Sequence, residues 1–151
     1  MIIRRAEPGD FLMLAELDRV GWGQNANSEF IPDGEHIWRF WVEYSSVFLA
    51  ETEGKPAGTA VMYRANQGNL FMFHKLVIAE NFRKQKLGQG LLRLLTQELD
   101  NYQADALLTV DPNNETMLHL CDKYGFSERD FIKGYYRSKE DRFLLRRRYK
   151  G

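Results

Sequence analysis

Cysteine is almost absent from this sequence. Cys121 is the only one in 151 residues, so no internal disulfide can form and a reducing compartment is expected. The three histidines, His36, His74 and His119, are far apart in the sequence, and no two of them have the spacing of zinc ligands. We therefore expect no metal site.

Long apolar runs and an excess of one charge are also missing. No stretch approaches the roughly 20 apolar residues that span a bilayer, and the first ten residues, MIIRRAEPGD, lack the apolar core of a secretory leader. We therefore expect a cytoplasmic protein with no membrane partner. Lysine plus arginine and aspartate plus glutamate both total 21, and this balance argues against a general nucleic-acid binder.

The patterns that are present predict one mixed α/β domain over residues 1–151, because 44% of the residues are hydrophobic and the length suits a single core. Period-two and period-3.6 apolar patterns indicate short strands and helices in turn. Strands are expected near 2–3, 47–50, 59–63, 70–78, 106–110 and after 126, the last around 143–147. Helices are expected after residue 10, around 37–42, after 90 and at 114–124, and a loop at 21–33.

Two of the helix predictions concern particular side chains. Asp10 is expected to cap the first helix, because a short acidic side chain suits that position. Ile37, Trp38, Trp41 and Val42 recur at helical spacing and are expected to form one apolar stripe on the second helix.

The stretch FRKQKLGQGLL, residues 82–92, joins a predicted strand to a predicted helix. Such a turn can bind an anion, because the first helical N–H groups lack internal partners and the helix dipole favours negative charge there. Alternatively, the glycines serve only the backbone freedom of a tight turn. The Walker pattern is missing, and Arg93 stands at the third glycine of the dinucleotide pattern G-x-G-x-x-G.

The same stretch resembles the acyl-CoA pyrophosphate loop, Q/R-x-x-G-x-G/A, of the GNAT superfamily of N-acetyltransferases. Residues 85–90 fit this pattern literally. A second register, against R-x-Q-G-L-G-x-A-L-L, is preferred because it also places residues 76–78 on the family's L-x-V strand end. In that register Lys86 replaces the first glycine, and the matching residues are Arg83, Gln85, Leu87, Gly88, Leu91 and Leu92.

Further motifs extend the resemblance over nearly the whole chain. The opening I-I-R-R-A-x-P-x-D is similar to the family's first strand and helix start, and Asn114 followed by L-C-D-K-Y-G-F resembles a motif near the family's C-terminal end. Residues 134–136 and 141–145 resemble the ending of members that acetylate protein N-termini. The resemblance implies a GNAT-like fold with a central, mostly antiparallel sheet flanked by about four helices.

The resemblance also implies acetyl-CoA as co-substrate and an amine as acceptor. In the family, the strand end pairs with the pantetheine arm, the amides of the bend surround the pyrophosphate, and an asparagine binds the pantetheine chain, a role compatible with helix capping. The implied acetyl-CoA-binding residues are Leu76, Val77, Ile78, Arg83, Lys84, Gln85, Lys86, Leu87, Gly88, Gln89, Gly90 and Asn114.

Acyl transfer to an amine needs a neutral amine, a donor for the oxyanion and a leaving thiolate. The family's oxyanion donor is a backbone N–H that maps here to Ile78. The tyrosine that usually protonates the leaving group is replaced by Cys121, and Tyr124 is expected to face elsewhere. Cys121 could protonate the coenzyme's sulfur, hold it by packing, or simply fill space in a buried helix.

His74 is the candidate general base. Alternation along a strand places it on one face with Leu76 and Ile78, and an imidazole with a pKa near 6.5 can accept a proton directly or through water. The arylalkylamine N-acetyltransferases resemble this arrangement. A hydrogen-bonded core histidine is the alternative. Thr109 stands where some relatives have a glutamate, which makes His74 more necessary.

Tyr135 and Tyr136 are the candidate acceptor-binding residues and favour a peptide N-terminal amine, with an aromatic or polyamine-like small amine as the alternative. A different class, a non-catalytic acyl-CoA-binding regulatory module, is also compatible with the missing tyrosine. Either a monomer or a homodimer is expected. The basic residues 146–150 are interpreted as the solvated face of a strand rather than as a site for an acidic partner.

Overall fold

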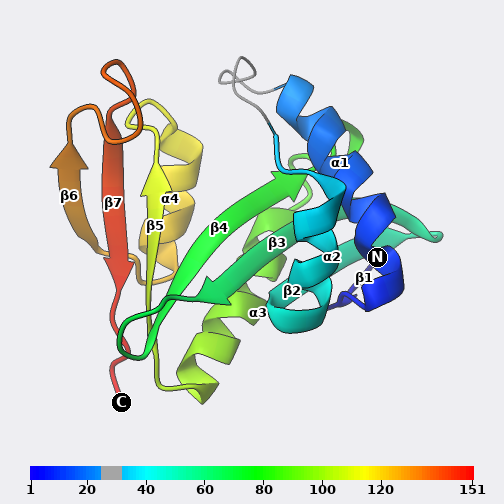
Figure 1. Cartoon of the computed structure of the whole chain (residues 1–151), viewed down its shortest axis with the longest axis horizontal. Coiled ribbons are helices and arrows are strands. Elements are labelled where there is room, and N and C mark those ends of the chain that lie inside the picture. Colours follow the sequence, from blue (N-terminus) through cyan, green and yellow to red (C-terminus); the bar gives the residue numbers. More distant parts are fainter. Residues whose placement is uncertain (25–31) are drawn as a thin grey trace. The chain divides into compact units, whose positions relative to one another are not determined.

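The computed structural model describes residues 1–24 and 32–151 (Figure 1). Its strands form one seven-stranded sheet in the order β1-β2-β3-β4-β5-β7-β6. Within the described residues no helix is long and apolar enough to cross a membrane. The strands are β1 (Ile2–Arg5), β2 (Ser46–Thr52), β3 (Lys55–Arg64), β4 (Leu70–Ile78), β5 (Asp105–Val110), β6 (Glu128–Ile132) and β7 (Arg142–Arg147). The helices are α1 (Phe11–Gly23), α2 (Glu35–Tyr44), α3 (Leu87–Asn101) and α4 (Glu115–Lys123), with 3-10 turns η1 (Pro8–Asp10) and η2 (Glu80–Phe82).

The pairing of the strands confirms the expected mixed α/β fold. β1 with β2, β2 with β3, β5 with β7 and β6 with β7 are antiparallel, whereas β4 and β5 are parallel. The chain groups into two compact units: Met1–Tyr63 with His74–Leu95, and Arg64–Phe73 with Thr96–Gly151. We call them unit 1 and unit 2, and β4 and α3 each contribute residues to both.

Unit 1 is built around the packing of α1 and α2, which lie side by side in Figure 1. Trp38, Trp41 and Val42 of α2 are buried as expected, but Ile37 is 38% exposed and does not belong to the stripe. Successive helical residues are about 100° apart, so Ile37 lies beside the arc that the other three share. The buried core of this unit contains Ala6, Leu14, Ala15, Leu17, Trp38, Trp41, Val42, Val47, Leu49 and Val61.

The expected loop over residues 21–33 was placed too early, because α1 continues through Gly23; residues 25–31 lie outside the described part of the chain. A Cβ atom at Gly21 would lie 2.8 Å from Cγ1 of Val77. This glycine therefore allows a close approach of the helix to β4 and does not end the helix. α3 likewise begins at Leu87, before rather than after Gly90.

In unit 2 the basic residues of β7 and the following tail pair with acidic side chains of the same unit. Arg146 contacts Asp105 at 2.7 Å, and Arg147 contacts Asp100 at 2.9 Å. Arg148 forms an ion pair with Glu128. Arg147 also donates from Nε to the carbonyl oxygen of Tyr124 at 3.0 Å. These arginines therefore tie β7 to neighbouring segments of unit 2.

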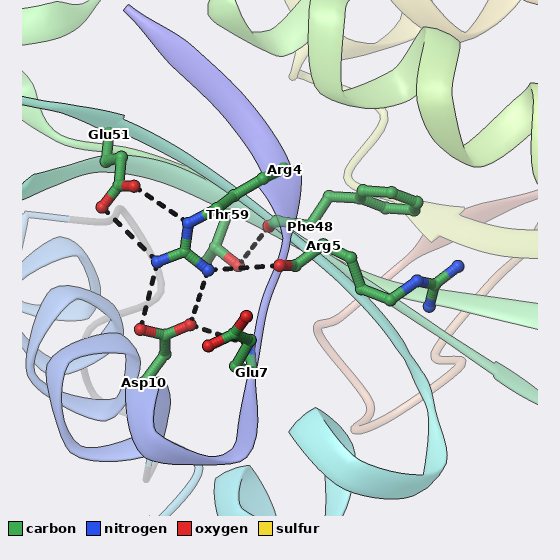
Figure 2. A network of polar contacts seen from close by, with 7 residues as sticks. All are labelled: Arg4, Arg5, Glu7, Asp10, Phe48, Glu51 and Thr59. Atoms are coloured by element: carbon green, nitrogen blue, oxygen red, sulfur yellow. Dashed lines mark hydrogen bonds and ion pairs between the residues drawn. The ribbon is translucent and has the colours of Figure 1, made fainter.

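A clamp around Arg4 connects β1, η1 and β2 in unit 1 (Figure 2). The guanidinium donates to both carboxylate oxygens of Asp10, at 2.8 and 3.2 Å, and to Oε1 of Glu51 at 2.9 Å. Asp10 also accepts the backbone N–H of Glu7 at 2.8 Å. The prediction that its side chain caps α1 is wrong: it makes no cap hydrogen bond there, because the preceding turn and Arg4 use both its oxygens.

The Arg4 clamp predicts a contribution to stability that depends on pH. Arg4 lowers the pKa of Asp10 through their hydrogen bond, so this contribution is present above the ordinary value of 3.8 and is lost as the pH falls below it. We expect Arg4→Met to lower the free energy of unfolding by about 2 kcal/mol at neutral pH, because it leaves two carboxylates without their donor. Urea denaturation between pH 3 and pH 7 measures both effects.

Arg39→Met is the matched control, because Arg39 forms an exposed ion pair with Glu43 on the surface of α2. It is expected to cost less than about 0.5 kcal/mol at any pH. Equal losses for the two variants would contradict a structural role of the clamp.

Candidate active site

The bend between β4 and α3 has an unusual backbone. Lys84 and Lys86 have φ angles of 65° and 62°, in the left-handed region that favours glycine. Lys86, which stands at the first glycine of the family pattern, thus adopts the conformation that a glycine would supply. The N–H of Gly90 donates to the carbonyl oxygen of Lys86 at 3.2 Å, so the amides of Leu87 and Gly88 precede the first intrahelical bond and point out of the helix end.

Arg83 braces the start of this bend. Its Nε donates to the carbonyl oxygen of Ile78 at 3.3 Å, and its Nη2 donates to the side chain of Gln24 at 3.3 Å. Gln24 in turn donates to Glu80 at 2.9 Å. The guanidinium is therefore committed to holding the strand end against the turn, while the side chains of residues 84–86 are exposed.

The end of β4 directs alternate amides to opposite edges of the strand. The N–H of Ala79 donates to the carbonyl oxygen of Ala57 in β3 at 2.9 Å. Because backbone groups alternate along a strand, the amides of Leu76 and Ile78 point to the other edge. The pairing of β4 with β5 covers residues 70–72, so these two amides lie beyond it.

His74 is not a core residue, since 34% of its side chain is exposed. Its ring lies 5.1 Å from that of Trp41 and 5.8 Å from that of Tyr63, and its Nε2 is 3.0 Å from Oδ2 of Asp33. The alternative of a hydrogen-bonded core histidine is therefore correct for the hydrogen bond and wrong for the burial. The ring has a hydrogen bond, but it also has access to solvent.

Asp33 is the centre of a charged group in unit 1. The ammonium of Lys75 lies 2.6 Å from Asp33 and 2.5 Å from Asp18, and the indole N–H of Trp38 donates to Asp18 at 3.1 Å. The hydrogen bond from His74 and the Lys75 ammonium together lower the pKa of Asp33 to about 2, against the opposing effect of burial. Sequence reasoning did not assign Asp33, Lys75 or Asp18 to the site.

Cys121 and Asn114 both belong to α4 in unit 2. Cys121 is fully buried, and burial raises the pKa of its thiol to about 12, although the charge of Arg129 opposes this. Such a thiol is a weak proton donor and does not form a thiolate at neutral pH, which favours the packing alternative. Asn114 caps α4, because its Oδ1 accepts the N–H of Met117 at 3.1 Å.

Tyr135 and Tyr136 lie on the exposed turn between β6 and β7, with ring centroids 4.8 Å apart. The turn is held by hydrogen bonds from Tyr135 N to Glu140 O at 2.9 Å and from Gly134 N to a carboxylate oxygen at 2.8 Å. The hydroxyl of Tyr136 lies 2.6 Å from that of Thr109 on β5. Sequence reasoning considered Thr109 only as a missing glutamate and did not anticipate this contact.

Comparisons with known proteins point to one family. The model of the acetyltransferase (GNAT) family matches residues 11–126. An N-alpha-acetyltransferase from Sulfurisphaera tokodaii is 26% identical over 156 residues, which cover 95% of this chain and 90% of that protein.

Solved structures share the fold. The ribosomal-protein-S18-alanine N-acetyltransferase from Escherichia coli has a TM-score of 0.80 at 21% identity, covering 99% of this chain and 94% of that one. The protein yncA from Salmonella typhimurium, solved with its cofactor acetyl-CoA, has a TM-score of 0.83 at 14% identity, covering 99% and 94%.

The family match covers most of the chain and includes β4, the bend at residues 83–87 and α4. The family match and the neighbour solved with acetyl-CoA support acetyl-CoA as the co-substrate. This protein belongs to the GNAT family and is an N-acetyltransferase that acts with acetyl-CoA.

Proposed function

We propose that the acceptor is the α-amine at the N-terminus of a peptide or protein, and that it attacks acetyl-CoA directly in a ternary complex. Two similar proteins support this choice. The relative from S. tokodaii is an N-alpha-acetyltransferase, and the E. coli protein of similar fold is a ribosomal-protein-S18-alanine N-acetyltransferase. The exposed Tyr135–Tyr136 pair, on a turn held by its own hydrogen bonds, offers two hydroxyls and two rings to an extended peptide.

The observation that carries the placement of acetyl-CoA is the bend with two left-handed lysines. It opens α3 with outward amides at Leu87 and Gly88, and two exposed ammonium groups lie beside them. Amides at a helix N-terminus and nearby cations both favour a diphosphate. We assign the pyrophosphate of acetyl-CoA to residues 83–90, and its pantetheine chain to residues 76–78.

The oxyanion donor is the backbone N–H of either Leu76 or Ile78, the two amides on the edge of β4 that faces away from β3. With a rise of about 3.3 Å per residue, Ile78 lies about 13 Å along the strand from His74, whereas Leu76 lies about 7 Å away. One water bridging two hydrogen bonds spans about 5.6 Å. If His74 is the base, the amide of Leu76 therefore suits the reacting carbonyl better than that of Ile78, to which the family pattern pointed.

His74 takes the proton from the attacking amine through this water. The amine nitrogen forms a bond to the acetyl carbon, the carbon–sulfur bond breaks, and the proton moves to the imidazole. Coenzyme A leaves as a thiolate, which needs little help because an ordinary thiol has a pKa near 8.5. Cys121 is thus assigned a packing role in α4 rather than that of a general acid.

Substitutions at Lys86 separate backbone conformation from charge. Lys86→Ala removes the cation and keeps the Cβ, whereas Lys86→Gly also relieves the left-handed conformation, which costs about 1–2 kcal/mol for a residue with a Cβ. Because glycine also gains freedom in the unfolded chain, we expect Lys86→Gly to exceed Lys86→Ala in stability by about 0.5–1 kcal/mol. Both should bind acetyl-CoA several-fold more weakly than the native chain at low salt.

Calorimetric titration with acetyl-CoA at two salt concentrations, with urea denaturation, tests both statements. The affinity lost by removing the cation should shrink at high salt. If Lys86→Gly is less stable than Lys86→Ala, the left-handed conformation does not strain the native chain. If acetyl-CoA fails to bind the native protein, or binds both variants as tightly as the native chain, the assignment of this bend is wrong.

Removing the proposed base should slow acetylation without weakening co-substrate binding. We expect His74→Ala to lower kcat about 100-fold at neutral pH, at the lower end of what general base catalysis contributes, and to remove the acidic limb of the pH–rate profile. The dissociation constant for acetyl-CoA should not change. An unaltered pH–rate profile would reject His74 as the base.

The acceptor is identified by release of coenzyme A with a panel of peptides that differ in the first residue, alongside polyamines and arylalkylamines. We expect turnover with peptides, including those beginning with alanine. Tyr136→Phe should raise KM for the peptide about 10-fold, because it removes a hydroxyl that is offered to the peptide and is positioned by its contact with Thr109. Binding of acetyl-CoA should not change. Turnover of small amines alone would assign the enzyme to the other acceptor class.

A further inference from the structure

The contact between Asp33 and His74 fixes where the imidazole carries its proton. Asp33 is ionised, since the hydrogen bond from His74 and the nearby Lys75 ammonium lower its pKa to about 2. A carboxylate only accepts hydrogen bonds. The nitrogen that faces Asp33 Oδ2 at 3.0 Å is Nε2, which must therefore carry the hydrogen, and the neutral ring keeps its lone pair on Nδ1.

The Asp33 carboxylate is also fixed by an ion pair with Lys75. The Lys75 ammonium bridges Asp33 and Asp18, only 8% of its side chain is exposed, and Asp18 is buried and receives the indole N–H of Trp38. These contacts attach the segment before α2 to α1 and to β4. Asp33 therefore faces the His74 ring from a fixed position rather than from a freely rotating surface side chain.

The net charge of this group depends on the protonation of His74. Asp18 and Asp33 supply two negative charges and Lys75 one positive charge, so the four side chains carry −1 with a neutral His74 and zero with a protonated one. The ring's other neighbours, Trp41 of α2 and Tyr63 of β3, are uncharged at neutral pH. An imidazolium formed during the reaction is therefore stabilised by the carboxylate at its Nε2.

We propose that Asp33 is a positioning residue for acetyl transfer: it holds His74 as the Nε2–H tautomer and makes Nδ1 the atom that accepts the proton of the acceptor amine. This inference rests on the proposed role of His74 as the base. Within residues 1–24 and 32–151, Nδ1 has no hydrogen-bond partner, so its lone pair is available to the bridging water.

The tautomer can be read from the native protein without any acceptor. In a protein labelled with ¹⁵N at histidine, the two ring nitrogens of a neutral imidazole have distinct chemical shifts, and the His74→Ala variant identifies the His74 signals among the three histidines. We expect the proton on Nε2 at a pH above the titration of the ring. A His74 ring with its proton on Nδ1 would overturn the inference.

Kinetics test the consequence for catalysis, with acetyl-CoA and an alanine-initiated peptide. Asp33→Asn should lower kcat about 10-fold and alter the acidic limb of the pH–rate profile, because the imidazolium formed during the transfer loses its carboxylate. The KM for acetyl-CoA should not change. Glu35→Gln is the matched control, since it removes an exposed carboxylate two residues away and should leave both quantities unaltered.

A double-mutant cycle separates this inference from the proposed function. Asp33→Asn should have no further effect on rate in the His74→Ala background, because Asp33 acts through the ring. If His74→Ala is slow but Asp33→Asn has the native rate, profile and tautomer, only the role of Asp33 is wrong. If His74→Ala itself has the native rate, the base assignment fails and this inference fails with it.

Discussion

The buried ammonium of Lys75 is the constraint on which the proposed catalytic half of unit 1 depends. A cation with so little exposed surface is costly unless it is paired, and here two carboxylates share it. Asp18 comes from α1 and Asp33 from the segment before α2, so one charge on β4 links the two helices that cover it. Removing either acid would leave the ammonium with a single carboxylate and change the net charge beside the ring of His74 from −1 to zero.

Next to this charged group, β4 serves a second purpose through its backbone. The amides of Leu76 and Ile78 that face away from β3 come just before the bend in the sequence. Arg83 holds the bend to the end of the strand by donating to the carbonyl oxygen of Ile78. The proposed diphosphate site, thioester site and base therefore lie on one continuous stretch, residues 74–90. A rigid strand followed by a helix is a suitable support, because the geometry of such a site must be held closely.

Much of this architecture could be predicted from local pattern. The strand at 70–78 was predicted with its observed ends, because a mostly apolar run, interrupted only by His74 and Lys75, is bounded there by polar and turn-forming residues. Predictions that treated glycine only as a helix breaker failed at two places. Gly21 lies inside α1 and allows its close approach to Val77, and α3 begins at Leu87, before Gly88 and Gly90. The left-handed conformation of Lys86 was not predicted: the resemblance to the family placed a lysine at a glycine position, and lysine carries no local signal for this conformation.

The charged group of the site could not be predicted from local pattern. Asp33 lies 41 residues before His74, and Asp18 lies 57 residues before Lys75. Aspartates in a loop or on a helix are ordinarily solvated, and only tertiary packing brings these two against β4. The same holds for the contact of Thr109 with Tyr136, which joins residues 27 positions apart.

The placement of the indole rings gives this enzyme a built-in optical reporter. The chain has three tryptophans, and all of them lie in unit 1. Trp22 and Trp38 each lie 5.8 Å from the Lys75 ammonium, and Trp41 lies against the imidazole of His74. The entire intrinsic tryptophan emission of the protein therefore originates beside the proposed base, and no fluorescent label is needed to follow events there.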